Sequence, residues 1–380
     1  MTTESGPTQR ARRRRASGTV VDFDGRRLAL ARRRQRLLRS ALAELTSVSA
    51  AAITQFERGS ARPTNAAVAE LALALGMPVD FFRQGRPIEP VPASAAHFRS
   101  LRATPAISRE QALAFAEISL VVVDLVEQYV DLPRVPPLAE PLDAEPEPGR
   151  IARLAAATRE RLGVDPGPVP HMVRLLEAHG IVVLRLPREI DHRVDAFSTE
   201  AGHRPLVLLS PVKDDRARSR FDAAHELAHL VMHQDVDPGS KIVERQADTF
   251  ASEFLAPSTE LEPELPRRVD WDALAQAKTK WGISLAALVH RAHRLGLWGE
   301  HAYRRANQHL AALGYPEPTP LGPPESPYLL GAAVELLSDA GTTIDDLAVA
   351  GRLPVGQIEE IVAAGSETRP RLSLTPDPAV

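Results

Sequence analysis

The sequence predicts an α+β fold that is mostly helical and contains one small sheet. Apolar side chains recur three and four residues apart across residues 27–83 and 108–130, which is the spacing of amphipathic helices. Two short runs rich in branched apolar residues, "IVVLRLP" and "RPLVLLS", are bounded by Gly, Pro and Ser and predict strands. Helical spacing returns around these runs within residues 151–300, so we expect helices packed on a small sheet.

The composition is that of a folded chain with two or three cores. The 380 residues include 46 Lys+Arg, 49 Asp+Glu and 44% hydrophobic residues, which excludes a disordered or fibrous protein. The chain has no Cys, so disulfides and thiolate metal sites are excluded and a metal would need His and carboxylate ligands. Neither a membrane-spanning run nor a signal peptide is recognisable, and we therefore expect a cytoplasmic protein without membrane contact.

Positive charge is concentrated at the start of the chain. Residues 1–40 hold twelve Arg against Glu4, Asp22 and Asp24, a local excess of nine positive charges. A block of this kind is typical of a nucleic-acid-binding surface and equally of a solvated basic arm. Charge alone leaves both interpretations open.

Proline-rich joints divide the chain into units. Residues 131–150 carry six Pro and five acidic residues, the composition of a linker without a core, and a second such joint spans 314–327. We expect five regions. They are a basic arm (1–20), a helical head (21–86), a helix with the linker (87–150), a body (151–300), and a small helical C-terminal unit with its tail (301–380).

The head is predicted to consist of successive short helices. Gly59, Pro63 and Gly76 separate the periodic segments. The expected helices cover residues 27–38, 40–45, 50–57 and 65–76. A longer amphipathic helix is expected across 108–130, with Ser108 as its N-cap.

The segment "FDAAHELAHLVMH" (221–233) suggests a metal site on a helix. His225 and His229 are four residues apart, so their side chains lie one turn apart on the same helix face and can chelate one zinc ion. Glu226 lies between them and points beside the metal, where it can take a proton from water. His233 lies about 12 Å along the axis from His225 and is rotated away, so we expect it to pack near the site without being a ligand.

A third protein ligand is expected from "VERQADTFASEFLAP" in the next helix. Glu244 and Glu253 lie on opposite faces because nine residues make two and a half turns. Ala247 and Ala251 share the face of Glu244, and these small residues let the two helices approach closely. We therefore predict Glu244 as the third ligand and Glu253 in solvent or in a salt bridge, with Asp248 as the next candidate ligand. The alternative is a buried helix whose histidines bond to each other or to the backbone.

These two motifs resemble the ImmA/IrrE metallopeptidases, in which a zinc helix is followed by a Glu-x-x-Ala helix. The resemblance covers about residues 151–300, including "DAFS" (195–198) and "WGISLAALVHRAHRLGLW" (281–298). It implies a zincin-like sheet and a gluzincin-like zinc peptidase. His225, His229 and Glu244 would be the zinc ligands, and Glu226 the general base.

Residues of the head resemble the XRE-type helix-turn-helix of phage repressors, and this resemblance implies a five-helix domain. Leu42, Val48 and Ile53 fall on core positions of two helices joined by a short turn, and Ser49 is expected to cap the second helix. This second helix, about 49–57, would lie in a major groove of DNA. The alternative is a helical bundle used for dimerisation or for binding a partner.

The expected DNA contacts depart from the family pattern at Ser47, where Gly is usual, and at Arg39, where Gln is usual. Thr54 and Gln55 are left as the main base-reading residues, and we expect the arginines at 32–34, 36 and 39 to supply most phosphate contacts. The candidate DNA-binding residues are Arg39, Ser49, Ala50, Ala51, Thr54, Gln55 and Arg58.

The C-terminal unit repeats one spacing of the head. Leu347 and Ile358 match the interval between Leu42 and Ile53 in a second, degenerate helix-turn-helix. Its expected outer face carries Asp345, Asp346, Glu359 and Glu360, and acidic side chains repel DNA phosphates. We expect this unit to pack or to contact protein.

Together the two resemblances imply a DNA-binding regulator with zinc-dependent endopeptidase activity in a stress or mobile-element response. The expected partners are double-stranded DNA and a protein substrate, either a helix-turn-helix repressor (this chain included) or an antitoxin-like protein. Single-stranded DNA is one candidate activator, and a homodimer is one candidate assembly. Two alternatives are a transcription factor with a non-cleaving sensor domain and a toxin–antitoxin-type binding module. A structural metal site needs no general base, so Glu226 argues against both.

Overall fold

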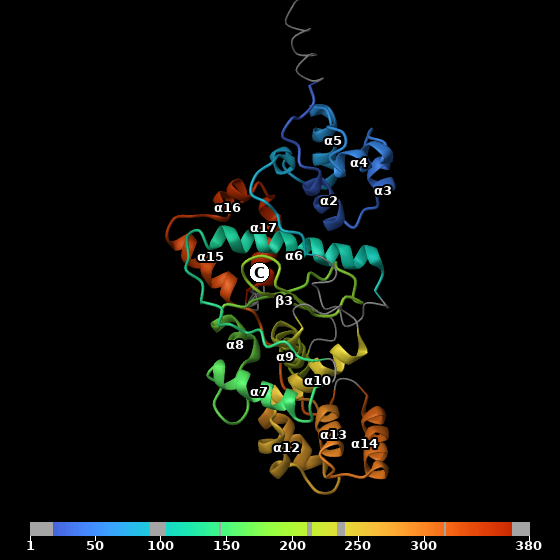
Figure 1. Cartoon of the computed structure of the whole chain (residues 1–380), viewed down its shortest axis with the longest axis vertical. Coiled ribbons are helices and arrows are strands. Elements are labelled where there is room, and N and C mark those ends of the chain that lie inside the picture. Colours follow the sequence, from blue (N-terminus) through green and yellow to red (C-terminus); the bar gives the residue numbers. More distant parts are fainter. Residues whose placement is uncertain are drawn as a thin grey trace, which may run out of the picture.

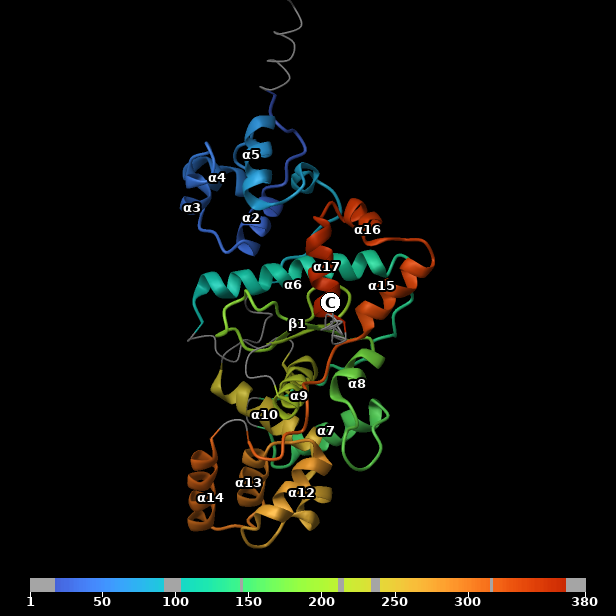
Figure 2. The same cartoon turned by 180° about the vertical axis from the view of Figure 1, so that it is seen from behind.

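Helices stack above and below one small sheet along the long axis of the molecule (Figures 1 and 2). The computed structural model describes residues 18–91, 104–143, 146–210, 215–233, 240–314 and 317–366. The basic arm before residue 18 and the tail after residue 366 lie outside the described residues. The mostly helical fold with a small sheet confirms the predicted fold class.

The sheet has three strands, β1 (Val182–Arg185), β2 (Phe197–Thr199) and β3 (Leu206–Leu209). β3 is central, parallel to β1 and antiparallel to β2. The two predicted strands, β1 and β3, are confirmed. The run "RPLVLLS" forms β3 and offers no free edge to a peptide, because β3 is paired on both sides. Free edges remain only on β1 and β2 among the described strands.

The two faces of the sheet belong to two different hydrophobic cores. On the strand pair β1–β3, Val182 and Leu206 belong to one core and Val183 and Val207 to the other. This alternation follows from the pleat, since neighbouring side chains in a strand point to opposite faces. One core continues upward into the head, and the other holds the helices of the candidate metal site.

The head contains four α-helices, and its fifth element is the 3₁₀ helix Val79–Phe82. The α-helices are α2 (Gly25–Arg34), α3 (Arg39–Glu44), α4 (Ala50–Glu57) and α5 (Asn65–Leu75). Ser49 accepts a hydrogen bond from the backbone N–H of Ala52, which confirms its predicted role as the cap of α4. Leu42 and Ile53 are fully buried, as predicted for core positions.

Helix α6 (Ala106–Val126) lies between the head and the sheet in both views (Figures 1 and 2). The expected helix is present, but the cap assignment is wrong. Pro105 is the N-cap residue, and its fixed φ suits a helix start. Ser108 lies in the first turn instead and donates to Asp191 Oδ2 at 2.9 Å. Most of α6 is buried because the head covers one side and the sheet lies on the other.

Arginines at and just after the end of α2 hold the head on the rest of the chain. Arg33 forms a two-pronged pair with the buried carboxylate of Glu117 on α6, with N–O distances of 3.1 and 2.7 Å. Arg34 pairs with Glu360, and Arg36 lies 3.4 Å from Asp191. The head is therefore attached by ion pairs as well as by a continuous apolar core.

The remaining helices pack below the sheet. Helices α9 and α10 lie against each other, and α7 packs on α10. Helices α12, α13 and α14 form the end of the molecule farthest from the head (Figure 1). The bounds are α7 (Arg150–Arg161), α8 (Met172–Ala178), α9 (Arg216–Met232), α10 (Lys241–Leu255), α11 (Ser258–Leu261), the 3₁₀ helix Glu262–Glu264, α12 (Trp271–Trp281), α13 (Leu285–Arg294) and α14 (Glu300–Leu313).

The C-terminal helices return to the top of the sheet. These are α15 (Leu329–Asp339), α16 (Ile344–Gly351) and α17 (Val355–Ala364), and they pack against α6 and β1. These three helices thus pack within the chain, which is one of the two roles expected, and a contact with another protein stays a prediction. Glu360, expected on the outer face, instead pairs with Arg34 of the head.

Both proline-rich joints are fastened to the body, which differs from the loose linkers expected from composition. In the first joint Leu132 and Leu138 are buried, and Glu140 N–H donates to the Val231 carbonyl at 2.8 Å. In the second joint Glu325 is only 3% exposed and pairs with the equally buried Arg220 at 2.6 Å. Apolar residues and acids within a proline-rich run can thus fix its path.

Glu177 on α8 makes stability depend on pH. Its Oε1 accepts the backbone N–H groups of Tyr328 and Leu329 at 2.8 and 3.0 Å, and burial raises its pKa from 4.5 to about 7. Between these values the unfolded carboxyl ionises while the folded one keeps its proton. The contribution of Glu177 to the free energy of unfolding therefore falls as pH rises through this window, by about 3 kcal/mol in total.

Glu177→Gln is expected to remove this fall, because the amide keeps an acceptor and does not titrate. Urea unfolding at pH 5, 6 and 7 measures it. Equal pH slopes for wild type and variant would show that this carboxyl is ionised in the folded protein.

Candidate metal centre

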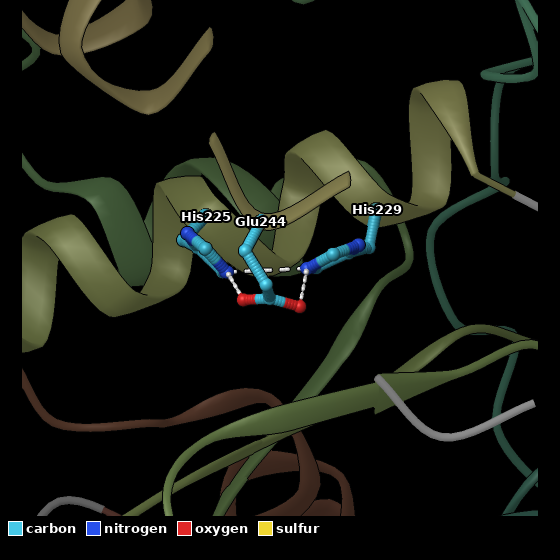
Figure 3. A group of neighbouring side chains, drawn as sticks. All are labelled: His225, His229 and Glu244. Atoms are coloured by element: carbon cyan, nitrogen blue, oxygen red, sulfur yellow. Dashed lines mark hydrogen bonds and ion pairs between the residues drawn. The ribbon is translucent and has the colours of Figure 1, made fainter. Parts of the chain in front are cut away.

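Three predicted ligands meet where α9 and α10 cross (Figure 3). His225 Nε2 lies 3.3 Å from Glu244 Oε2, and His229 Nε2 lies 3.8 Å from Glu244 Oε1. The two Nε2 atoms are 3.1 Å apart. The structure thus brings His225, His229 and Glu244 together as the sequence predicted.

Small residues allow this close approach of the two helices. Ala224 and Ala228 on α9, and Ala247 and Ala251 on α10, are completely buried. Without larger side chains between them, the helix backbones can lie close enough for Glu244 to reach both imidazoles. The predicted alanine stripe of α10 is confirmed.

Hydrogen bonds fix the tautomer of His225. Its Nδ1 lies 3.0 Å from Oδ1 of Asp248, which is a proton acceptor when ionised. Nδ1 therefore carries the proton, and the lone pair of Nε2 faces Glu244. Asp248, the alternative third ligand, thus orients a ligand from behind, and sequence analysis missed this role. Its position four residues after Glu244, on the same face of α10, was the available signal.

A second chain of bonds fixes His229. His233 Nδ1 lies 3.0 Å from His229 Nδ1, and His233 Nε2 lies 3.0 Å from Gln246 Oε1. Gln246 donates its own amide N–H to the Asp143 carbonyl at 3.2 Å, which orients its oxygen toward His233. Burial lowers the pKa of His233, and the neutral ring donates to Gln246 through Nε2 and accepts from His229 through Nδ1. His229 Nε2 then keeps a lone pair that faces Glu244, while His233 lies behind this ligand, as predicted.

The donor set fits a divalent cation. Both oxygens of Glu244 are buried without a hydrogen-bond partner, although they face two imidazole nitrogens. The three donor atoms lie within 4.8 Å of one another, and two ligands of tetrahedral zinc are separated by about 3.3 Å. Two lone pairs and a carboxylate converging in a buried place are costly unless a cation binds among them.

Glu226 lies beside this group and does not belong to it. It is 1% exposed, and Ser198 of β2 donates to its Oε2 at 2.7 Å. Burial raises the pKa of Glu226 to about 8. A cation held by the neighbouring ligands would lower this pKa, because a positive charge favours the carboxylate. Sequence analysis noted "DAFS" but assigned Ser198 no role.

Glu253 is turned away from the metal group, as predicted. Its Oε1 lies 2.5 Å from Arg291 Nη1 on α13, and the backbone N–H of Ser258 donates to Oε2 at 2.9 Å. Since Arg291 is also buried, this salt bridge ties α10 to α13 inside the protein.

A second group of potential ligands, Asp124, Glu127 and His203, lies near the surface. Arg204 donates to Glu127 Oε1 at 2.9 Å through Nε, so a guanidinium already balances this carboxylate. A cation would have to compete with Arg204, which makes this group a poor metal site.

Asp248→Ala is expected to weaken zinc binding about 10- to 100-fold without abolishing it, because Asp248 only orients His225. Competition with a chelating dye measures the affinity. Thr249→Ala is the matched control, since the Thr249 hydroxyl donates to the Arg245 carbonyl of its own helix. An unchanged affinity in Asp248→Ala would remove Asp248 from the site.

The candidate DNA-binding residues of the head lie on α3, α4 and their flanks. Ala51, Gln55 and Arg58 are exposed, and Ala50 is partly exposed. Arg39 is about half exposed and donates to Glu57 Oε2 at 2.7 Å. Two of the candidate hydroxyl groups form hydrogen bonds within α4: Ser49 caps the helix, and Thr54 donates to the Ala50 carbonyl at 2.8 Å. Gln55 therefore remains the better placed of the two expected base-reading residues.

The expected phosphate contacts of the α2 arginines need correction. Arg32 is buried and donates to Glu57 Oε1 at 2.6 Å, so it is closed to DNA. Arg33, Arg34 and Arg36 pair with acidic residues outside the head, namely Glu117, Glu360 and Asp191. The cluster of positive charge suggested phosphate contacts, but the acidic partners of these arginines lie far away in the sequence and could not be inferred from it. Arg58 and Arg62 are the exposed arginines next to α4.

Comparisons with known families agree with this division. Residues 25–81 match a helix-turn-helix domain, and residues 176–293 match the IrrE N-terminal-like domain, a peptidase family. The second match includes all three strands and helices α9 and α10. No curated protein matches the chain. In the part of the chain that the structure describes, every helix is too short or too polar to cross a membrane. The chain thus carries an N-terminal helix-turn-helix domain followed by an IrrE N-terminal-like domain of the M78 peptidase family.

Proposed function

We propose that this chain is a DNA-binding regulator whose body is a zinc-dependent endopeptidase. One observation carries the peptidase assignment: two imidazole lone pairs and a buried carboxylate converge beside a second buried carboxylate, Glu226. A purely structural metal site would not need Glu226 in this position.

Each residue of the group has a distinct task. His225, His229 and Glu244 would hold zinc, which when bound polarises the peptide carbonyl and makes water more acidic. Glu226 would take a proton from the attacking water and pass it to the leaving amine. Ser198 keeps the Glu226 carboxyl in place by its hydrogen bond.

The substrate would bind as an extended segment along β2. This strand lies at one side of the sheet, packs against α9 and contributes Ser198 to the site. An edge strand can pair with a peptide through backbone hydrogen bonds, and β2 lies at the edge of the described sheet. Segments that unfold into a strand would be the preferred substrates.

We propose that the substrate is a separate helix-turn-helix repressor or an antitoxin-like protein in the cytoplasm, with single-stranded DNA as one candidate signal. The chain's own head is less suited, because Arg33 and Arg34 bind it to α6 and α17 and both proline-rich joints are fastened. Cleavage of the partner would relieve repression.

The head would contact duplex DNA through α4. Phosphate contacts supply most of the affinity in such complexes, so binding by the full chain should fall steeply as salt rises. Arg58→Ala should weaken binding to all sequences. The slope of the logarithm of the binding constant against the logarithm of salt concentration should become shallower by about 0.9. Gln55→Ala should relax sequence preference more than it weakens binding.

Fluorescence anisotropy at several salt concentrations measures these effects. Arg294→Ala, an exposed arginine at the far end of the molecule, is the control and should leave binding unchanged. A full chain that binds no duplex at low salt would favour a protein-interaction role for the head.

A further inference from the structure

A separate hollow of about 430 Å³ lies between the start of α12 and one face of α14. These helices form the end of the molecule farthest from the head (Figures 1 and 2). Its size falls within the range of small-molecule sites. Trp271 lines one side, and α14 supplies the other. The small residues Ala302 and Ala306 of α14 also line it and leave room between the two helices.

Trp271 differs from the other two tryptophans of the chain. Trp281 and Trp298 are 1% and 2% exposed and donate their indole N–H groups to Glu264 and to the Pro266 carbonyl. Trp271 is partly exposed, and its indole N–H has no acceptor among the described residues. Its ring packs partly against the lower hydrophobic core and lies beside His309, with ring centroids 4.4 Å apart. The first two tryptophans are structural, whereas Trp271 leaves ring surface and a donor available to the hollow.

The polar lining of the hollow is basic. His301, Arg305 and His309 follow each other at one-turn intervals on α14, and none of the described lining residues is acidic. The side chains of His301 and Arg305 form no ion pair within the described ranges. The adjacent Arg304, which does not line the hollow, lies 3.6 Å from Glu300. An unpaired guanidinium beside an aromatic ring suits a ligand that is both planar and anionic.

We propose that this hollow binds a mononucleotide, with the base against Trp271 and the phosphate on Arg305 and His301. A guanidinium binds phosphate through two parallel N–H bonds, and an indole ring offers a stacking surface to any base. The volume suits one nucleotide and is too small for a folded partner. This site is separate from the metal centre and from the helix-turn-helix, and it does not depend on the proposed peptidase activity.

Tryptophan fluorescence of the full chain reports on this site, because Trp281 and Trp298 are shielded and Trp271 is not. The chain is titrated with AMP, GMP, CMP and UMP, and separately with adenosine and inorganic phosphate. We expect saturable quenching by at least one nucleotide and at least tenfold weaker binding of adenosine and of phosphate. Arg305→Ala should lower the affinity for the nucleotide at least tenfold, and the matched control Arg304→Ala should change this affinity less than twofold. Trp271→Leu should also lower the affinity for the nucleotide at least tenfold, which calorimetry measures because the fluorescent side chain is gone.

Four results would overturn the proposal. One is the absence of saturable quenching by any nucleotide, and another is phosphate binding as tightly as the nucleotide. The third is an equal effect of Arg304→Ala and Arg305→Ala in variants whose circular dichroism matches wild type. The fourth is a single-stranded oligonucleotide that needs Arg305 while no mononucleotide binds, which would assign the hollow to a nucleic-acid strand.

Discussion

Glu226→Gln is expected to lower the rate of peptide cleavage by between about 10² and 10⁴-fold while zinc content stays unchanged. The amide cannot accept the proton of the attacking water. It can still accept the hydrogen bond that Ser198 donates, so the geometry around it should persist. Mass spectrometry of a partner repressor incubated with each protein measures the rate of fragment formation.

Glu177→Gln is a matched control for this change, because it also converts a buried carboxyl to an amide but lies outside the metal centre. It should cleave at the wild-type rate. If Glu226→Gln also cleaved at that rate, Glu226 would not be the general base. If neither wild type nor variant cleaved any repressor, with or without single-stranded DNA, the non-cleaving sensor would replace the peptidase.

Zinc binding should depend on all three residues of the His-His-Glu group. Wild type is expected to hold about one zinc ion per chain, and His225→Ala, His229→Ala or Glu244→Ala should each weaken binding on the order of a thousandfold. Each substitution removes one of the protein ligands. Dialysis against a chelator followed by elemental analysis measures the loss.

Glu253→Gln is the control on the same helix. It should keep its zinc while losing stability, because buried Arg291 would face a neutral amide in place of a carboxylate. Retention of zinc in Glu244→Ala would move the third ligand elsewhere. If Glu253→Gln lost its zinc while Glu244→Ala kept it, the assignment of the two helix faces would be wrong.

Features that depend on local helix geometry could be predicted from the sequence. The one-turn spacing of His225 and His229, and the half-turn offset between Glu244 and Glu253, follow directly from the period of an α-helix. Ser49 as the cap of α4 follows from the preference of short polar side chains at helix starts. In these cases neighbouring residues determine the outcome.

Features that depend on distant partners could not be predicted. The sequence predicted phosphate contacts for the arginines of α2. The acidic partners of Arg33 and Arg34, however, lie 84 and 326 residues further along the chain. A charge pattern shows that a side chain needs a partner but does not say which one. The choice between phosphate and carboxylate is made by packing of the head on α6.

The support around the metal ligands was missed for a related reason. Ser198 comes from β2, a strand of three residues that is too short to show a period. Asp248 and Gln246 acquire their roles only when α10 lies against α9. Sequence could identify candidate ligands, whereas the residues that orient them required the fold.

Zinc between His225, His229 and Glu244 is tested most directly by anomalous diffraction at the zinc absorption edge from crystals of the full chain. The expected result is one strong peak per chain, about 2.0–2.2 Å from both Nε2 atoms and a Glu244 oxygen. Glu226 should lie close by without contacting the metal. A peak at Asp124, Glu127 and His203 instead, or the absence of any peak in zinc-soaked crystals, would contradict this metal centre.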